Sequence, residues 1–185
     1  MELELAQNET VEDLQFKNLK IIQNKKGFCF GIDSILLSDF AKSIKKDTRV
    51  LDLGTGTGII ATLLCEKTEL KEMIGVEIQR EVYEMAKKSI RLNKLEKQIG
   101  FIQFDIRKFK IINEDILKLS DILEKFTFDA IVTNPPYQKR GTGLKNEEEK
   151  KIISRHETTA TLEDFIRVSS DFIKDKGEFY MVHRP

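Results

Sequence analysis

The sequence predicts an α/β fold in one domain, with a doubly wound, mostly parallel sheet that has helices on both faces. Two observations support this prediction. Apolar runs of strand length alternate along the chain with segments of helical spacing, as successive βαβ units require. Glycine-rich and polar motifs follow these runs at the carboxyl ends of the strands, where open sheets of this kind bind ligands. The chain has 185 residues, 40% of them hydrophobic, which is enough for one sizeable core.

The amino-terminal part of the chain, residues 1–47, is expected to form a hairpin and a helix that pack on the binding site. Residues 48–185 are expected to form the sheet and its helices. The apolar runs 19–23 and 27–30 flank the polar turn 24–26, which predicts the hairpin.

Strands and helices are then expected to alternate to the end of the chain. Asp33-Ser34 is typical of a helix start, and Thr161-Leu162-Glu163-Asp164 is a variant of the capping box. Residues 114–126 have a helical spacing of their own. The predicted helices are 35–44, 57–67, 79–93 and 161–174, and the predicted core strands are 49–53, 73–77, 100–105, 128–133 and 178–183.

A glycine-rich turn follows the first core strand, with Gly54, Gly56 and Gly58 in G-x-G-x-G spacing. Glycines at a strand-to-helix junction allow positive φ and close approach of a ligand to the backbone. The spacing differs from the G-x-G-x-x-G of dinucleotide sites. The next two strands end near Glu77 and Asp105, which suit a ribose diol and an adenine amino group. Taken singly, each carboxylate also fits a solvated strand end or a helix cap.

The motif Asn134-Pro135-Pro136-Tyr137 ends the fourth apolar run and suits methylation of a planar amino group. Such a nitrogen is a poor nucleophile, because its lone pair is delocalised into the ring. The Asn134 side-chain oxygen and the Pro135 carbonyl are placed to accept its two N–H bonds and favour a nucleophilic geometry. The prolines stiffen the turn, and Tyr137 is suited to stack on the ring. Alone, the motif also fits a proline-rich turn after a buried strand.

Composition narrows the class of protein further. The 31 basic and 31 acidic residues cancel, so net charge gives no support for nucleic-acid binding, although a local patch is compatible with it. Cys29 and Cys65 lie far apart without a CxxC pattern, so neither a disulfide nor a metal site is expected. An acidic amino terminus and the lack of an apolar stretch near eighteen residues predict neither a signal peptide nor a membrane span. We expect a reducing, cytoplasmic location.

The polar stretch 138–159 follows the Asn-Pro-Pro-Tyr turn and is expected to be a substrate-binding loop. Lys139, Arg140 and Arg155 are its candidates for phosphate contacts. The lone His156 is assigned a structural role rather than that of a general base.

These motifs resemble the class I S-adenosylmethionine-dependent methyltransferases. More narrowly, they resemble the bacterial tRNA adenine-N6 methyltransferases that modify adenine 37 of a valine tRNA, from about residue 10 to the end of the chain. The narrower likeness rests on Ile22-Gln23, Gly27-Phe28, Phe30-Gly31-Ile32-Asp33, Leu36-Leu37, Asp52 to Gly58, Gly75 to Gln79, Asn134 to Tyr137, Arg155-His156-Glu157 and Val182-His183-Arg184-Pro185.

The resemblance implies a Rossmann-like sheet with its strands in the order 3-2-1-4-5. It implies that S-adenosylmethionine is the cofactor, with S-adenosylhomocysteine as product and no metal, and that tRNA is the partner, with no obligatory protein partner. Phe30 and Asp33 become candidates for a segment that closes over the cofactor, although a plain hairpin and packing helix is the alternative. The implied cofactor residues are Asp52, Gly54, Thr55, Gly56, Gly58, Glu77, Ile78, Asp105, Ile106 and Asn134.

Members of that family continue beyond the fifth core strand with a last helix and two final strands. We therefore expect a carboxyl-terminally truncated sheet, in which strand 178–183 becomes an edge prone to self-association.

Other functions stay open at this point. Glutamine N5-methylation of peptide-chain release factors uses a similar planar amine, but those enzymes carry an amino-terminal helical domain, and only about 47 residues precede the first core strand here. Guanine-N2 methylation of ribosomal RNA is a nearer alternative. A cofactor-binding or RNA-binding module without turnover is the alternative outside enzymes.

Overall fold

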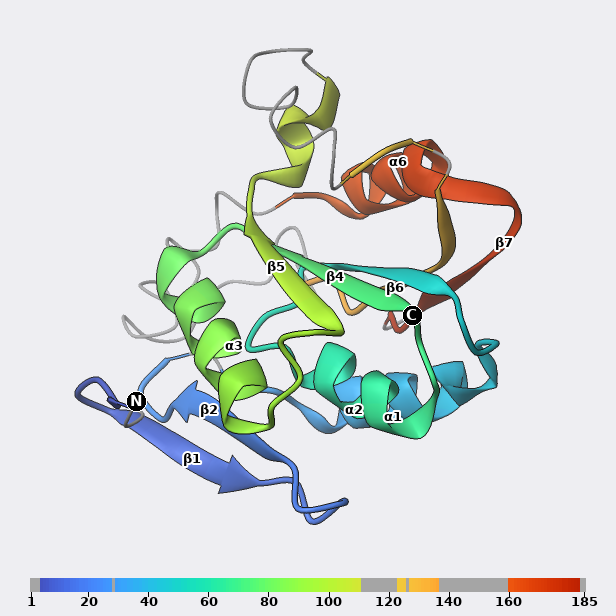
Figure 1. Cartoon of the computed structure of the whole chain (residues 1–185). Helices are drawn as coiled ribbons and strands as arrows, with labels where there is room; N and C mark the ends of the chain where they lie inside the picture. The colour runs from blue at the N-terminus through green and yellow to red at the C-terminus, as the bar shows by residue number, and fades with distance from the viewer. Residues whose placement is uncertain (1–3, 28, 111–122, 126, 137–159, 184–185) are drawn as a thin grey trace.

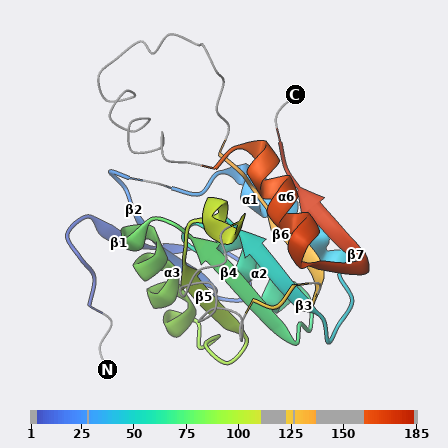
Figure 2. The ribbon, with the colours of Figure 1, turned by 90° about the horizontal axis from the view of Figure 1, so that it is seen from above.

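The structure is a computed structural model that describes residues 4–27, 29–110, 123–125, 127–136 and 160–183. Within these ranges its centre is a parallel sheet with the strand order β5-β4-β3-β6-β7 (Figures 1 and 2). This is the predicted order 3-2-1-4-5. The strands are β3 (Arg49–Leu53), β4 (Glu72–Glu77), β5 (Ile99–Gln103), β6 (Phe128–Thr133) and β7 (Ile173–Met181). The last of them begins five residues before the predicted start at 178.

Helices cover both faces of the sheet, as the doubly wound prediction requires. In Figure 1, α1 (Ile32–Phe40) and α2 (Ile59–Lys67) lie below the sheet and α6 (Leu162–Phe172) lies above it. Seen from above in Figure 2, α6 crosses the half of the sheet that contains β6 and β7. The helix α3 (Arg80–Leu92) packs beside β5, and the short 3-10 turns are η1 (Ala41–Ser43) and η2 (Ile106–Lys110).

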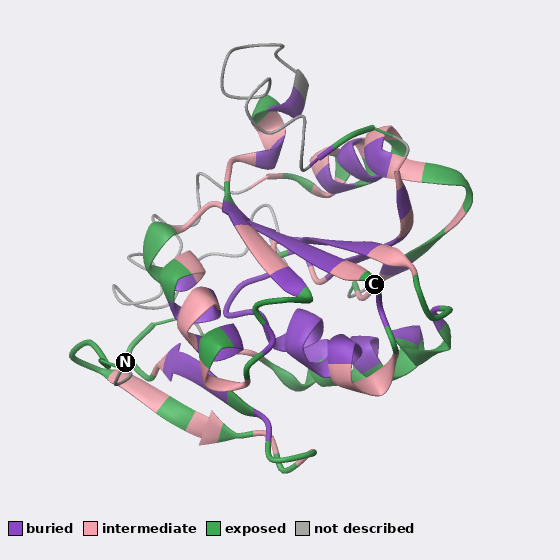
Figure 3. Ribbon diagram, viewed as in Figure 1, coloured by how far each residue is buried: buried purple, intermediate pink, exposed green. Residues whose placement is uncertain are grey.

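Alternation along each strand divides the core into two layers. In β3, Val50 belongs to the cluster with α1 and α2, whereas its neighbour Leu51 belongs to the cluster with α6. The same alternation separates Met73 from Ile74 in β4. Because successive strand residues point to opposite faces, strands buried on both faces become almost continuously apolar. Figure 3 shows the central strands mostly buried, with helices above and below them.

The capping box predicted at residue 161 is confirmed. The Thr161 hydroxyl accepts the Asp164 backbone N–H at 3.3 Å, and the Asp164 carboxylate accepts the Thr161 backbone N–H at 3.1 Å. These reciprocal bonds satisfy donors that the first helical turn leaves without partners.

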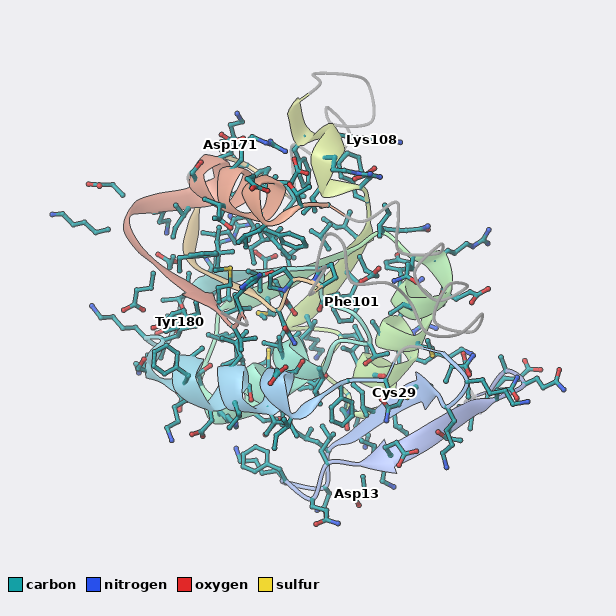
Figure 4. The ribbon with its side chains drawn as sticks, turned by 180° about the vertical axis from the view of Figure 1, so that it is seen from behind. Asp13, Cys29, Phe101, Lys108, Asp171 and Tyr180 are labelled. Atoms are coloured by element: carbon teal, nitrogen blue, oxygen red, sulfur yellow. The ribbon has the colours of Figure 1, made fainter. Side chains whose placement is uncertain are left out.

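The carboxyl-terminal end of α1 and the following turn η1 contact β7. The Tyr180 side chain, labelled in Figure 4, meets the Phe40 ring edge to face at 5.9 Å between centroids. Its hydroxyl lies 3.3 Å from the Ser43 hydroxyl. These contacts hold the amino-terminal helix against the last strand of the sheet.

The predicted pairing of 19–23 with 27–30 is wrong. The hairpin instead joins β1 (Glu9–Asp13) to β2 (Lys20–Asn24), with Val11 opposite Ile22. Residues 9–13 carry three acidic side chains and one apolar residue, Val11, so their sequence gives little sign of a strand. The strand β1 forms because its backbone pairs with β2, which has a buried face, and this pairing compensates for the few apolar side chains of β1.

The hairpin is fastened to α3 through β2. Ile22 is fully buried beside Val82 and Met85, and its backbone N–H donates to the Ser89 hydroxyl at 2.9 Å. The Asn93 side chain accepts the Lys20 N–H and donates to the Lys20 carbonyl. The division of the chain at residues 47 and 48 stays a prediction.

We predict that Ile22→Ala destabilises the chain by about 2–5 kcal/mol, the usual cost of truncating a buried isoleucine. The matched control is Val11→Ala, because Val11 is the register partner of Ile22 and is 39% exposed. Val11→Ala should lower the free energy of unfolding by no more than about 1 kcal/mol. Urea unfolding of both variants measures the free energies, and equal losses would contradict the docking of this hairpin through β2.

Candidate active site

A pocket opens at the carboxyl ends of the core strands, where the sequence motifs were expected to meet. Parallel register sets Leu53 of β3 beside Val76 of β4 and Thr133 of β6, so the segments that follow them share one edge. Most of the predicted binding segments contribute to the wall of the pocket. Its lining residues are Gly54, Gly56, Val76, Glu77, Ile78, Gln79, Val82, Phe104, Asp105, Ile106, Asn134, Pro136, Ala160 and Phe165.

The glycine turn has the left-handed backbone that its sequence predicts. Gly54, Gly56 and Gly58 have φ values of 71°, 60° and 84°. The backbone N–H groups of Gly54 and Thr55 both donate to the Val76 carbonyl, at 2.9 and 3.0 Å. These bonds hold the turn against the end of β4.

Gly58 lies at the amino-terminal cap of α2 and meets a second constraint. A Cβ atom at this position would lie 2.8 Å from the Phe101 ring, which packs on the α2 and α3 side of the sheet (Figure 4). Gly75 faces the same ring, with a Cβ position 2.5 Å from it. Gly58 therefore acts through backbone conformation and packing, and it does not line the pocket.

Asp52 supports the turn from below and also does not line the pocket. It is fully buried, and its Oδ2 accepts the Thr55 hydroxyl at 2.6 Å. Its Oδ1 has no hydrogen-bond partner among the residues that the structure describes. Burial raises the pKa of Asp52 to about 7, against the Thr55 hydrogen bond that lowers it, and the charge of Glu77 adds to the rise.

Glu77 links the glycine turn to α3. Its Oε2 accepts the Gly56 backbone N–H at 3.1 Å, and its Oε1 accepts the Gln79 N–H at 2.8 Å. Burial raises the pKa of Glu77, although backbone hydrogen bonds from Gln79, Gly56 and Ile78 oppose the rise. Glu77 is only 5% exposed, so it is not a solvated strand end; it braces the backbone of the glycine turn and also lines the pocket.

Asp105 lies two residues beyond Gln103, the last residue of β5, whereas the sequence predicted it as the last residue of that strand. Its carboxylate accepts the Arg107 Nε and Nη2 at 2.9 and 2.8 Å and the Arg107 backbone N–H at 3.0 Å. Burial alone would raise the pKa of Asp105, but the hydrogen bonds and charge of Arg107 outweigh it and hold that pKa below the usual value. Asp105 is thereby kept ionised at the pocket wall.

Asn134 reaches the pocket from the end of β6. The preceding Thr133 is fully buried, and its hydroxyl donates to the Leu53 carbonyl at 2.7 Å, which joins the ends of β6 and β3. The Asn134 Nδ2 donates to the Ser34 hydroxyl of α1 at 3.0 Å. Pro136 also lines the pocket, whereas Pro135 does not.

Several predicted site residues lie elsewhere. Phe30 and Asp33 do not line the pocket, and the Phe30 N–H is held by the Gln23 side chain at 3.2 Å. Thr55 turns its hydroxyl toward Asp52. The remaining predicted contacts, Tyr137, Lys139, Arg140 and Arg155, lie outside the described residues.

Sequence reasoning did not select six of the lining residues: Val76, Gln79, Val82, Phe104, Ala160 and Phe165. Val76, Gln79 and Phe104 are within two residues of predicted ones, so a wider window at each strand end would have found them. Phe165 has no such signal. It comes from α6, and its ring lies 3.3 Å from the position that a Cβ on Gly54 would take.

Two further searches cover the part of the chain that the structure describes. No group of three or more His, Cys, Asp or Glu side chains there is arranged to hold a metal ion. None of the helices in those ranges has the length and apolar character of a membrane span.

Comparison with known proteins agrees with this geometry. A family model for the methyltransferase small domain matches residues 13–185. The tRNA1(Val) (adenine(37)-N6)-methyltransferase of Histophilus somni (strain 2336) is 28% identical over 172 residues, which cover 92% of this chain and 67% of that protein. The protein of the same name from Haemophilus influenzae is 35% identical over 134 residues, 72% of this chain and 53% of the relative.

Solved structures share the fold at lower identity. M. jannaschii TYW2 in complex with AdoMet has a TM-score of 0.60 and 17% identity, over 94% of this chain and 62% of that one. P. horikoshii TYW2 in complex with MeSAdo also has a TM-score of 0.60, with 16% identity over 91% of this chain and 50% of that one. The Rossmann-like class I architecture is therefore confirmed.

We predict that Gly58→Ala destabilises the chain by about 2 kcal/mol or more, because a left-handed backbone and a crowded Cβ are both costly. Gly31→Ala is the matched control, since Gly31 has φ −98° and no heavy atom of the described residues lies within 4 Å of its Cβ position. Thermal unfolding of the two variants measures the difference. A Gly58→Ala protein as stable as the Gly31→Ala protein would contradict this account of the turn.

We predict that Asp52 makes stability depend on pH. Its pKa rises from 3.8 to about 7 on folding, so its contribution to the free energy of unfolding is fully present below about pH 4 and is lost as pH rises through 7. Asp52→Asn should remove this contribution. Urea unfolding between pH 4.5 and 8 should show that the free energy of unfolding of the variant rises relative to that of the parent as pH increases. A difference that does not depend on pH would contradict a buried Asp52 carboxyl that holds its proton.

Proposed function

The chain belongs to the methyltransferase small-domain family, and we propose that it transfers a methyl group from S-adenosylmethionine to N6 of an adenine in tRNA. The observation that carries this proposal is a single pocket lined by Asn134 and Pro136 together with Gly54, Gly56 and Glu77. The relatives named tRNA1(Val) (adenine(37)-N6)-methyltransferase support adenine 37 of a valine tRNA as the target. Such a substrate implies a cytoplasmic location.

The pocket fits the cofactor in its donors, acceptors and apolar walls. Glu77 is suited to the ribose hydroxyls, because its carboxylate lines the pocket at the end of β4 and accepts hydrogen bonds. Ile78, Phe104 and Ile106 are suited to enclose a flat adenine ring. Asp105 is suited to the adenine amino group through its Oδ2, which accepts Arg107 Nη2 at 2.8 Å and shares Arg107 Nε, at 3.2 Å, with Oδ1.

The glycine turn leaves space in the pocket for the cofactor, because its glycines have no side chains. Gly54 and Gly56 present bare backbone to the pocket, in a conformation that a residue with a Cβ adopts only at a cost. Asp52 and Thr55 hold this backbone from behind.

The turn after β6 is assigned to binding and orienting the target amine. When bound, S-adenosylmethionine supplies a methyl group activated by its sulfonium. The Asn134 oxygen and the Pro135 carbonyl accept the two N–H bonds of the target and aim its nitrogen, so rate enhancement comes from positioning and from exclusion of water. The proton of the amine is lost to solvent after transfer. Tyr137 is assigned to stacking on the flipped base, and Lys139, Arg140 and Arg155 to RNA phosphates.

Nucleoside mass spectrometry tests the proposal directly. Unmodified valine tRNA is incubated with the chain and S-adenosylmethionine, and cofactor binding is measured by calorimetry on the same sample. N6-methyladenosine next to the anticodon is the expected product. N2-methylguanosine in ribosomal RNA, or methylglutamine in a release factor, would replace the proposed substrate, and cofactor binding without any transfer would favour a binding module.

We predict that Asn134→Ala lowers the rate of methyl transfer by at least about 100-fold, since misplacement of a reacting group by 1 Å has an effect of that order. Cofactor affinity should stay nearly unchanged, because Glu77, Asp105 and the glycine turn remain in place. Single-turnover kinetics gives the rate and calorimetry gives the affinity. A large loss of cofactor affinity with an unchanged rate would contradict the assignment of Asn134 to the target amine.

A further inference from the structure

Asn134 is held by a residue 100 positions away in the sequence. Its Nδ2 donates to the Ser34 hydroxyl at 3.0 Å, and Ser34 is only 5% exposed. Neither Ser34 nor this bond is anticipated by the glycine, acidic or Asn-Pro-Pro motifs. We propose that Ser34 is a positioning residue that orients the Asn134 amide for methyl transfer. This inference rests on the function proposed for Asn134.

The reason lies in the two unlike ends of the amide. A target amine offers N–H bonds, so the productive orientation of Asn134 directs its oxygen to the substrate. The amide nitrogen then points to the other side, into the protein, where its N–H needs an acceptor. The Ser34 hydroxyl lies there and accepts it. In the opposite orientation, the amide would set N–H bonds against the N–H bonds of the substrate.

Removal of the hydroxyl therefore loosens the productive position of the Asn134 side chain. With alanine at position 34, the Asn134 Nδ2 loses the Ser34 acceptor when its oxygen faces the substrate. A serine hydroxyl both donates and accepts, so the bond fixes where the amide lies, while the N–H bonds of the substrate select its oxygen. Without the bond the population of correctly placed amide falls, and the rate of transfer falls with it.

Ser34 is well placed to act as a fixed point. Leu37 and Ala41 of the same segment belong to the core cluster that includes α2. One turn after Ser34, the Ser38 hydroxyl accepts Lys67 Nζ from the end of α2 at 3.0 Å. The helix α2 begins at the glycine turn. The packed pair of α1 and α2 therefore positions both the proposed cofactor-binding turn and the hydroxyl that holds Asn134.

The first experiment compares three variants in methyl transfer to valine tRNA. Ser34→Ala is expected to lower kcat by about 2- to 10-fold, the range that a lost hydrogen bond supports, with KM for S-adenosylmethionine unchanged. Ser34→Thr keeps the hydroxyl and should restore kcat. Ser38→Ala is the control, because Ser38 is also buried in α1 but bonds to Ile35 and Lys67 instead. An unchanged kcat in Ser34→Ala, or an equal loss in Ser38→Ala, would overturn the proposal.

A second experiment reads the bond without turnover. In protein labelled with [15N]asparagine, the side-chain NH2 signals of Asn134 are those missing from the spectrum of Asn134→Asp. Ser34→Ala should shift these signals and speed their exchange with solvent, while Ser38→Ala leaves them in place. Unchanged signals in Ser34→Ala would overturn the proposal. A parent chain that transfers no methyl group would count against the proposed function, and the NMR result would then decide alone whether Ser34 holds Asn134.

Discussion

Parallel pairing of β3 with β4 and β6 is the constraint on which the rest of the structure depends. It sets the ends of three strands side by side, and three hydrogen bonds then join those ends. The Val76 carbonyl receives the N–H groups of the glycine turn, and the Leu53 carbonyl receives the Thr133 hydroxyl. The pocket lies where these ends meet, so its shape is a consequence of strand register.

Stability competes at this edge with the demands of the proposed binding site. Asp52 and Glu77 are buried carboxyls whose pKa values burial raises, and a core built for stability alone would not contain them. Backbone N–H groups and a threonine hydroxyl offset part of that cost. The glycines add strain-free left-handed turns but sacrifice side-chain packing. Such local conflicts are expected at functional sites, where the binding surface rather than the core decides the residue.

The amino-terminal segment is part of the site without lining it. Its hairpin is fixed to α3 by Ile22, and Gln23 holds the backbone of Phe30 just before α1 begins. The helix α1 then places Ser34 against Asn134. A segment that the sequence suggested as a cover for the cofactor thus acts in this structure as a brace between α3 and the turn after β6.

The sequence by itself determined the elements whose information is local. Apolar runs located the five core strands, glycine spacing predicted the positive φ values, and Thr161 with Asp164 predicted a helix cap, because each depends on neighbours in the chain. Tertiary structure decided what depends on distant partners. The β1 strand forms because β2 is docked on α3, Phe165 enters the pocket because α6 packs over β6, and Ser34 meets Asn134 across 100 residues. Contacts of that kind arise from packing between elements, which no local pattern of residues encodes.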